Sequence, residues 1–279
     1  MEQIRIGSWA ELQERLFEDA WQEELGRHRS NHAFRGRSDA GEGLETSLVR
    51  LGGHAPSVEL YLLRNFRKYA RRSDVPSDSV WDWLALGQHH GLPTRLLDWT
   101  YSPYVALHFA TADIAAFDRD GVVWTLDYVR AREQLPAALG EVLEREGANV
   151  FTPELLARAA PGLRELNDLA GEPFCLFLEP PSLDDRIVNQ YALFSLLSDP
   201  SESLDGWVRG HPELGRKFVI PAELKWEIRD KLDQANITER VLFPGLDGLS
   251  AWLTRYYRPR DEQTAVPARE PSASSQRRL

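Results

Sequence analysis

Apolar residues recur at helical spacing in several segments of the chain. Leu12, Leu16 and Ala20 keep a helical period behind Ser8 and Glu11, which fit a capping box. Trp21 and Leu25 continue this period, so the pattern predicts a helix over residues 9–27, within an N-terminal unit that spans 1–30. The other segments with this period predict helices over 58–70, 80–88, 102–110, 221–234 and 246–257.

Shorter apolar runs predict strands between these helices. Residues 174–178 are continuously apolar, which is typical of a central strand. Residues 186–197 fit either a strand or a helix, and the apolar segment 241–244 after Glu239 is expected to form the final strand. Further strands are predicted over 31–38, 121–127 and 217–220.

Two stretches stand apart from this alternation. Residues 130–170 are charged, rich in Ala and Glu, and helical in pattern, which indicates a helical insertion in a main domain over 31–257. Beyond Pro259 the chain consists largely of Pro, Ser, Arg and Gln, so we expect a disordered tail over 258–279.

Composition and charge exclude several classes of protein. The formal net charge of −10 gives no overall attraction to nucleic acid or to an anionic membrane. A single cysteine, Cys175, provides neither a disulfide framework nor a thiolate metal site. Because no signal region and no apolar run long enough to span a bilayer occur, we expect a cytoplasmic protein without a membrane partner.

A polar cluster lies between the helices predicted at 80–88 and 102–110. Leu96 and Leu97 draw this segment inward, and buried polar groups cost several kcal/mol unless they pair or meet a ligand. The segment is therefore a candidate site. Its polar and aromatic members are Gln88, His89, His90, Thr94, Arg95, Asp98, Trp99 and Thr100.

Several motifs resemble those of the FRG domain family, which is named for its Phe-Arg-Gly sequence. Phe34-Arg35-Gly36 matches that sequence, and the run from His90 to Thr100 matches a longer and more specific motif. Gln190, within 186–194, and the segment 242–249 complete the resemblance, which covers roughly residues 30 to 257.

A second resemblance, to ADP-ribosyltransferases that look like bacterial toxins, implies a reaction. These enzymes carry Arg or His on an early strand, an aromatic-Ser/Thr pair on a second strand, and Glu or Gln on a third. Phe34-Arg35-Gly36 is similar to the first motif and Trp99-Thr100 to the second, while Gln190 and Glu239 are both candidates for the third. The resemblance implies an α+β fold with a central split mixed or antiparallel sheet and flanking helices, and NAD as a substrate.

The resemblance also implies roles for the candidate residues. Arg35 would bind the NAD phosphates as a bidentate donor, and Gln190 or Glu239 would hold the ribose 2′-hydroxyl. His89, His90 and Asp98 would place or deprotonate the acceptor. The candidate catalytic residues are Arg35, His90, Asp98, Thr100, Gln190 and Glu239. The candidate NAD-binding residues are Phe34, Arg35, Gly36, His89, Thr94, Arg95, Trp99, Thr100 and Tyr191.

Structural roles compete with these assignments. Arg35 can pair with Asp98, Arg95 can serve in a buried ion pair, and Trp99 can belong to the core. Glu239 can be a solvated turn residue. A metal site is not expected, because the adjacent side chains of His89 and His90 diverge and no third ligand follows at a suitable spacing.

Taken together, the motifs favour an ADP-ribosyltransferase-like enzyme that transfers ADP-ribose from NAD to a nucleic acid or a protein. Such an enzyme would act as a toxin or phage-defence effector, and an antitoxin is a possible partner protein. One alternative is a non-catalytic module that senses a nucleotide or another ligand. Another is a glycosidase or nuclease that uses Asp98 and Glu239.

Overall fold

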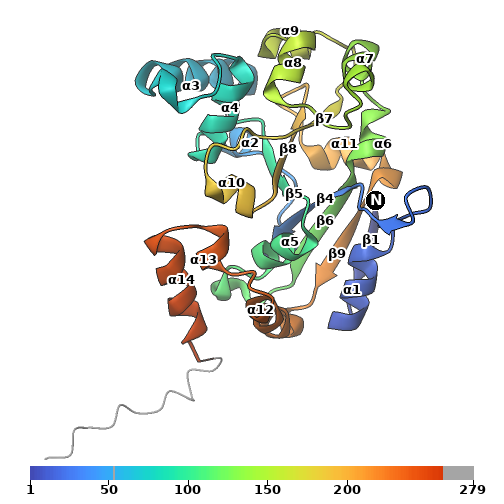
Figure 1. The fold of residues 1–279 in the computed structure, drawn as a ribbon, viewed down its shortest axis with the longest axis vertical. Coiled ribbons are helices and arrows are strands. Elements are labelled where there is room, and N and C mark those ends of the chain that lie inside the picture. Colours follow the sequence, from blue (N-terminus) through green and yellow to red (C-terminus); the bar gives the residue numbers. More distant parts are fainter. Residues whose placement is uncertain (53, 260–279) are drawn as a thin grey trace, which may run out of the picture.

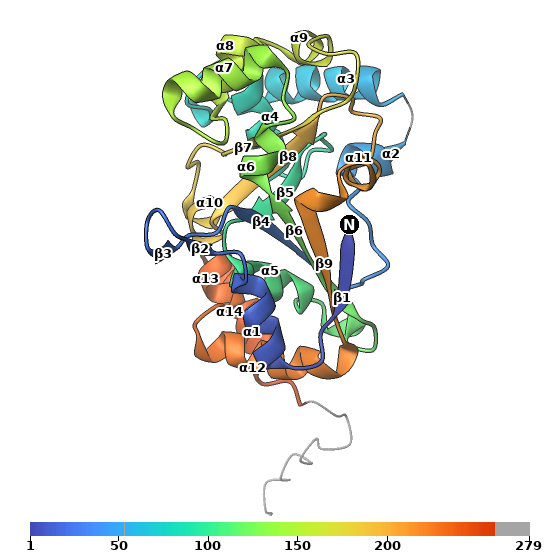
Figure 2. The ribbon, with the colours of Figure 1, turned by 90° about the vertical axis from the view of Figure 1, so that its right-hand side faces the viewer.

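A mixed seven-stranded sheet forms the centre of the computed structural model, which describes residues 1–52 and 54–259 (Figures 1 and 2). Its strand order is β7-β8-β5-β4-β6-β9-β1. The β1–β9 pair is parallel and the other neighbours are antiparallel. The strands are β1 (Glu2–Arg5), β4 (His32–Arg37), β5 (Leu97–Thr100), β6 (Gly121–Asp127), β7 (Cys175–Leu178), β8 (Ala192–Leu197) and β9 (Gly215–Ile220).

Helices flank this sheet, so the predicted combination of a mixed sheet and flanking helices is confirmed. None of them, within the described ranges, is both long and apolar enough to cross a bilayer. In chain order they are α1 (Trp9–Phe17), α2 (Ser47–Leu51), α3 (Ala55–Tyr69), α4 (Val80–His89), α5 (Pro103–Ala110), α6 (Tyr128–Arg132), α7 (Ala137–Glu146), α8 (Pro153–Ala159), α9 (Leu163–Asn167), α10 (Asp185–Asn189), α11 (Leu204–Gly210), α12 (Lys225–Gln234), α13 (Glu239–Leu242) and α14 (Leu246–Tyr256).

The two halves of the sheet meet at the β4–β5 boundary. Only one residue pair, Phe34 with Thr100, is in register there, whereas β4 pairs with β6 along its whole length. Three apolar cores hold the sheet and its helices together. One joins α3, α4, α7, α8 and α9 to β7 and β8, and a second joins α1, α5 and α12 to β4, β6 and β9. The third contains residues of β4, β5, β6, β7 and β8 and packs the two halves against each other. In Figure 1 α3, α8 and α9 lie at one end of the molecule, α1 and α12 lie toward the other, and α5 lies between them.

Several predicted helices occur where their sequence signals place them. Ser102 caps α5 by accepting a hydrogen bond from the Val105 amide, with Pro103 in the first turn. Ser79 caps α4 in the same way, and the helical pattern over 130–170 corresponds to α6–α9. The predicted tail lies, from residue 260 onward, outside the described residues.

The long first helix predicted over 9–27 is wrong. Helix α1 ends at Phe17, and a small hairpin of β2 (Trp21–Gln22) and β3 (Arg27–His28) follows. Trp21 and Leu25 are exposed, so their apolar period does not correspond to a buried face. Gly26 turns the chain with φ +57°, a conformation that ends regular structure and suits glycine.

Three strand predictions also need correction. Strand β7 lies at the edge of the sheet, where the Phe151 segment and the helices of the first core cover it. Residues 186–197 contain both proposed elements, because α10 ends and β8 begins on either side of Tyr191. The segment after Glu239 continues as helix α13 and forms no strand.

Gly36 packs β4 directly against α5. A Cβ atom at this position would lie 1.8 Å from the Ala106 carbonyl oxygen and 2.7 Å from the Ala110 nitrogen. Both neighbours are backbone atoms, so they cannot turn away as a side chain does. The glycine of the Phe-Arg-Gly motif is therefore required for the contact between the strand and the helix.

We predict that Gly36→Ala lowers the free energy of unfolding by about 3 kcal/mol, because the added methyl overpacks the β4–α5 contact. Gly140→Ala is the matched control, since a Cβ there meets no atom within 4 Å and Ala favours helix α7. Urea unfolding followed by circular dichroism measures both. Equal stability of Gly36→Ala and the wild type would contradict the close packing.

Candidate functional site

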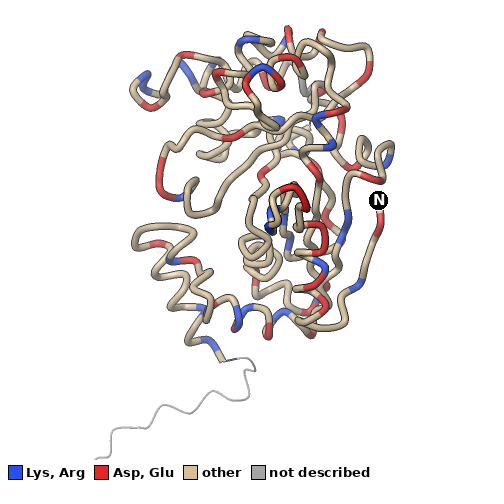
Figure 3. The backbone as a smooth tube through the Cα atoms, turned by 45° about the vertical axis from the view of Figure 1, so that its right-hand side comes forward, with Lys and Arg blue, Asp and Glu red and all other residues tan. Residues whose placement is uncertain are grey.

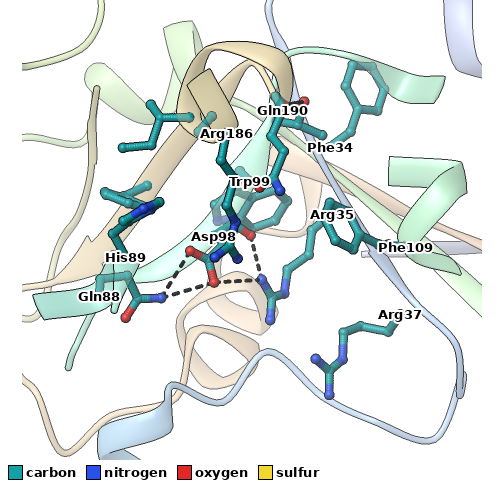
Figure 4. A pocket seen from close by; sticks show the side chains of 15 residues that line it. Phe34, Arg35, Arg37, Gln88, His89, Asp98, Trp99, Phe109, Arg186 and Gln190 are labelled. Atoms are coloured by element: carbon teal, nitrogen blue, oxygen red, sulfur yellow. Dashed lines mark hydrogen bonds and ion pairs between the residues drawn. The ribbon is translucent and has the colours of Figure 1, made fainter. Parts of the chain in front are cut away.

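A cavity of about 240 Å³ opens at the boundary between the two halves of the sheet. It lies where β4, the end of α4, β5 and the α10–β8 turn meet, so segments far apart in the sequence share it (Figure 4). Its lining residues are Phe34, Arg35, Gly36, Arg37, Gln88, His89, Asp98, Trp99, Thr100, Phe109, Arg186, Ile187, Gln190, Ala192 and Phe194.

Arg35 extends from β4 into this cavity and crosses the boundary to β5. Its Nη1 donates a hydrogen bond of 2.5 Å to the Asp98 carbonyl oxygen and lies 3.9 Å from the Asp98 carboxylate. The Nε atom is buried and has no partner among the described residues. Burial lowers the pKa of Arg35 to about 10, and Arg37 and Arg50 contribute in the same direction against the opposing effect of Asp98. Arg35 therefore remains a cation at neutral pH.

The cavity is electropositive although the protein is acidic. Lys, Arg, Asp and Glu are spread over the whole backbone (Figure 3), and the net charge is −10. The cavity lining, in contrast, contains three arginines, Arg35, Arg37 and Arg186, and a single carboxylate, Asp98, although Arg37 also pairs with Glu42 beyond the lining. Burial lowers the pKa of Arg37, and nearby Arg50 lowers it further. An anionic ligand would relieve this concentration of positive charge.

Asp98 is held in place from the side of α4. Gln88 Nε2 donates to both carboxylate oxygens of Asp98, at 3.0 Å each. Thr94 Oγ1 in turn donates to Gln88 Oε1 at 2.6 Å, and Thr94 is fully buried. Thr94, predicted to bind NAD, thus contacts Gln88 and does not line the cavity.

The two adjacent histidines have separate environments. His89 lines the cavity, and its Nε2 lies 2.7 Å from Asp184 Oδ2. Burial raises the pKa of Asp184, but the Ile187 amide and His89 outweigh it, so the net pKa lies below its ordinary value. His90 is the exposed C-cap residue of α4 and does not line the cavity, so a direct catalytic role for it is not supported.

Thr100 connects the second motif to Gln190. Its hydroxyl donates to the Gln190 carbonyl oxygen at 2.7 Å and accepts from the Ser102 amide at 3.0 Å. Gln190 Nε2 donates to the Leu242 carbonyl oxygen at 2.9 Å, which fixes the side chain against α13. Thr100 is almost fully buried, so its hydroxyl positions the α10–β8 turn.

Glu239, the other candidate for the third motif, lies outside the cavity. Its two carboxylate oxygens accept from Arg255 at 2.6 and 2.8 Å, and Asp233 accepts from the same guanidinium. Burial raises the pKa of Glu239, but the hydrogen bonds from Arg255 outweigh it and hold the pKa below its ordinary value. Glu239 therefore joins α13 to α14 and is neither a cavity residue nor a solvated turn residue.

Arg95 and Tyr191, both predicted to bind NAD, also lie outside the cavity. Arg95 is buried in an ion pair with Glu59 and donates to the Ser198 carbonyl oxygen at 3.0 Å. Tyr191 is 60% exposed, has φ +48°, and packs on Tyr101 with a ring-centroid distance of 4.9 Å. Arg95 therefore stabilises the interior, whereas Tyr191 is a surface residue of the α10–β8 turn.

Trp99 lines the cavity but is mainly a core residue. Its Nε1 donates to Ser195 Oγ at 2.8 Å, and the residue is 3% exposed. The ring packs edge-on against Phe177. Its indole is therefore not free to stack on a ligand, whereas Phe109 is only partly buried at the cavity.

Several cavity residues had no role assigned from the sequence. Arg37 lies two positions after Arg35, and alternate residues of a strand share a face, so this spacing was a usable signal. Gln88 was part of the polar cluster but had no stated partner. Arg186 and Phe194 bound the segment 186–194, which the family resemblance includes and which lines the cavity, but neither residue, nor Phe109, had an assigned role.

Part of the chain matches a known family model. The FRG domain family model matches residues 30–119. This range contains Arg35, Gln88, Asp98 and Thr100, but ends before the α10–β8 turn. No curated protein and no solved structure was found to match the chain.

We predict that Arg95→Ala lowers the free energy of unfolding by about 3–5 kcal/mol, because it leaves the Glu59 carboxylate buried without its cation. The double variant Arg95→Met with Glu59→Leu should recover part of this loss, since it removes both charges. Thermal and urea unfolding measure these effects. A stable Arg95→Ala variant that failed to bind ligand would instead restore a binding role for Arg95.

Proposed function

We propose that this FRG-domain protein is an ADP-ribosyltransferase-like enzyme that binds NAD in the cavity at the β4–β5 boundary. One observation carries the proposal. The three segments that resemble transferase motifs, on β4, on β5 and before β8, lie on adjacent strands and line one cavity. They are separated by 63 residues between Arg35 and Asp98 and by 90 between Thr100 and Gln190. If these segments had unrelated structural roles, we would not expect them to line the same cavity.

Arg35 is the proposed contact for the NAD pyrophosphate. A guanidinium offers planar, bidentate donors to phosphate, and burial strengthens such a charge-assisted hydrogen bond. Arg35 already has one nitrogen fixed on the Asp98 carbonyl and another buried without a partner among the described residues. Arg37 and Arg186 add positive charge on the same cavity, so a diphosphate would be held by several cations.

Gln190 is the proposed residue of the third motif, in place of Glu239. It precedes β8, lines the cavity and is fixed by Thr100 and Leu242. Glu239 does not line the cavity, and its carboxylate is bound by Arg255. In this proposal the Gln190 amide contacts the ribose next to nicotinamide, and Phe34 and Phe109 form the apolar wall.

The proposed reaction is displacement at C1′ of that ribose. The bond from C1′ to the nicotinamide nitrogen breaks, and its electron pair neutralises the pyridinium. The acceptor, a nucleic acid or protein nucleophile, gives a lone pair to C1′ and loses a proton to water. Because the transition state is loose, positioning and electrostatic stabilisation supply most of the catalysis.

A non-catalytic ligand-sensing module is the second candidate, and a specific observation favours it. The third-motif position carries the neutral amide of Gln190, which already donates to the Leu242 carbonyl. A glycosidase or nuclease that uses Asp98 and Glu239 has less support, because Asp98 lines the cavity while Glu239 does not. The two remaining candidates differ in one product, since only the transferase releases nicotinamide.

We predict that saturating NAD stabilises the wild type by about 2.7 kcal/mol at a hundredfold excess over its dissociation constant. Arg35→Ala should abolish this stabilisation, because it removes the buried cation at the cavity. Arg119→Ala is the matched control, since this arginine pairs with Asp39 outside the cavity. Differential scanning fluorimetry measures the shifts, and chromatography measures nicotinamide release in the presence of DNA, RNA or cell extract.

The outcomes separate the candidates. Stabilisation by NAD with nicotinamide release supports the transferase. Stabilisation that depends on Arg35 without any nicotinamide release supports the sensing module. If NAD neither stabilises the protein nor loses nicotinamide, the proposed NAD site is wrong.

A further inference from the structure

We infer that Asp98 supplies the catalytic carboxylate of this site and that Gln88 is its positioning residue. This inference rests on the proposed function and goes beyond it, because the motif comparison assigns the ribose-contacting role to the third motif. The residue there is the amide of Gln190, which brings no negative charge. A cation that develops at C1′ needs a negative charge from elsewhere in the cavity.

Asp98 is the one carboxylate among the described residues that line the cavity. Its side chain is 61% exposed, whereas the Arg35 side chain beside it is 10% exposed. Figure 4 shows the carboxylate between Gln88 and Arg35, with Gln190 and Arg186 on the same side of the cavity. Asp98 is thus accessible to a ligand that contacts these residues.

The carboxylate forms an ion pair with Arg35 but accepts no hydrogen bond from it. Arg35 Nη1 lies 3.9 Å from Asp98 Oδ2 and donates instead, at 2.5 Å, to the Asp98 carbonyl oxygen. The main-chain contact fixes the guanidinium and leaves the carboxylate available. The cavity therefore presents a cation and an anion side by side.

NAD has the complementary distribution of charge. Its pyrophosphate is anionic, and its pyridinium and the adjoining C1′ are cationic during bond cleavage. Arg35 with Arg37 and Arg186 suits the first group, and Asp98 suits the second. An all-arginine cavity would bind the phosphates but would oppose the positive charge of the transition state.

A relay of polar groups, in which Thr94 is fully buried, orients the carboxylate. The Ser47 hydroxyl accepts from the Thr94 amide at 3.1 Å, and the Thr94 hydroxyl donates to Gln88 Oε1 at 2.6 Å. Gln88 Nε2 then contacts both oxygens of Asp98. The acceptor bond to Thr94 fixes the amide orientation of Gln88, so that its NH₂ group faces the carboxylate. An exposed surface aspartate needs no such restraint, whereas a catalytic one does.

In the reaction step, the C1′–nitrogen electron pair leaves with nicotinamide, and the Asp98 carboxylate stabilises the positive charge left on the ribose. The acceptor nucleophile then forms its bond to C1′, and its proton passes to water. Asp98 forms no covalent bond and is unchanged at the end. Its contribution is electrostatic, so an isosteric amide should bind NAD but fail to support turnover.

The test compares Asp98→Asn with Asp78→Asn in the full chain, using NAD as the probe. Asp78 is the matched control, because its side chain is 51% exposed and pairs with Arg67, but it lies outside the cavity. We expect Asp98→Asn to lower kcat for nicotinamide release by about a hundredfold, with NAD affinity within threefold of wild type. Asp78→Asn should retain wild-type kcat, and Asp98→Glu should recover part of the lost rate.

Gln88→Leu provides a second measurement that retains the carboxylate. We expect a drop in kcat of about tenfold with unchanged NAD affinity, because the carboxylate loses its orientation. A purely structural role for Gln88 would instead lower the melting temperature and leave kcat of the folded fraction unchanged. If Asp98→Asn is unstable, Gln88→Leu tests the role of the Asp98 carboxylate in its place.

The possible failures are distinguishable. If the wild type releases nicotinamide and Asp98→Asn does so at a rate within threefold, the catalytic role of Asp98 is wrong while the transferase proposal stands. If the wild type releases no nicotinamide with any acceptor, the transferase proposal fails and the inference about Asp98 fails with it.

Discussion

The contact between Arg35 and the Asp98 carbonyl oxygen connects β4 to β5, the neighbouring strands of the sheet that share the least backbone pairing. Strands β4 and β5 share one registered pair, Phe34 with Thr100, and then separate. The buried guanidinium extends across this opening, and the cavity lies beside it. Where the pairing of strands is interrupted, backbone and side-chain groups remain available that a continuous sheet would occupy. The same interruption therefore limits the backbone pairing between the two halves, which a shared apolar core still packs together, and it makes room for the site.

The C-terminal helices hold the α10–β8 turn, which forms part of the cavity wall. Gln190 and Asn189 donate to the carbonyl oxygens of Leu242 and Val241, at 2.9 and 2.8 Å. The Arg186 guanidinium lies 5.1 Å from the centre of the Phe243 ring. Arg255 in turn fixes α13 to α12 and α14 through Glu239 and Asp233. The α10–β8 turn thus has a defined position although it lies on the surface, which suits a segment that contacts a ligand.

Sequence patterns correctly predicted the helices and strands that have local signals. They failed for segments whose secondary structure is determined by tertiary contacts. Helices α4 and α5 have caps and dense apolar faces, so their positions were predictable. The break at Tyr191 and the helix at Glu239 have no such signal, and the contacts between α10 and α13 that accompany them join segments far apart in the sequence. Within the site, the motifs identified Arg35, Asp98 and Gln190 as candidates. They could not separate these residues from Arg95, whose partner Glu59 lies 36 positions away in the sequence.

Hydrogen–deuterium exchange with and without saturating NAD shows whether NAD binds where the three motif segments meet. We expect slower exchange in residues 88–100 and 186–192, where ligand contacts would reduce local opening. A different cavity, of about 570 Å³, lies between α12 and α14 and is lined by Trp226 and Trp252. Slower exchange confined to that region, or no change at either place, would mean that NAD does not bind at the β4–β5 boundary.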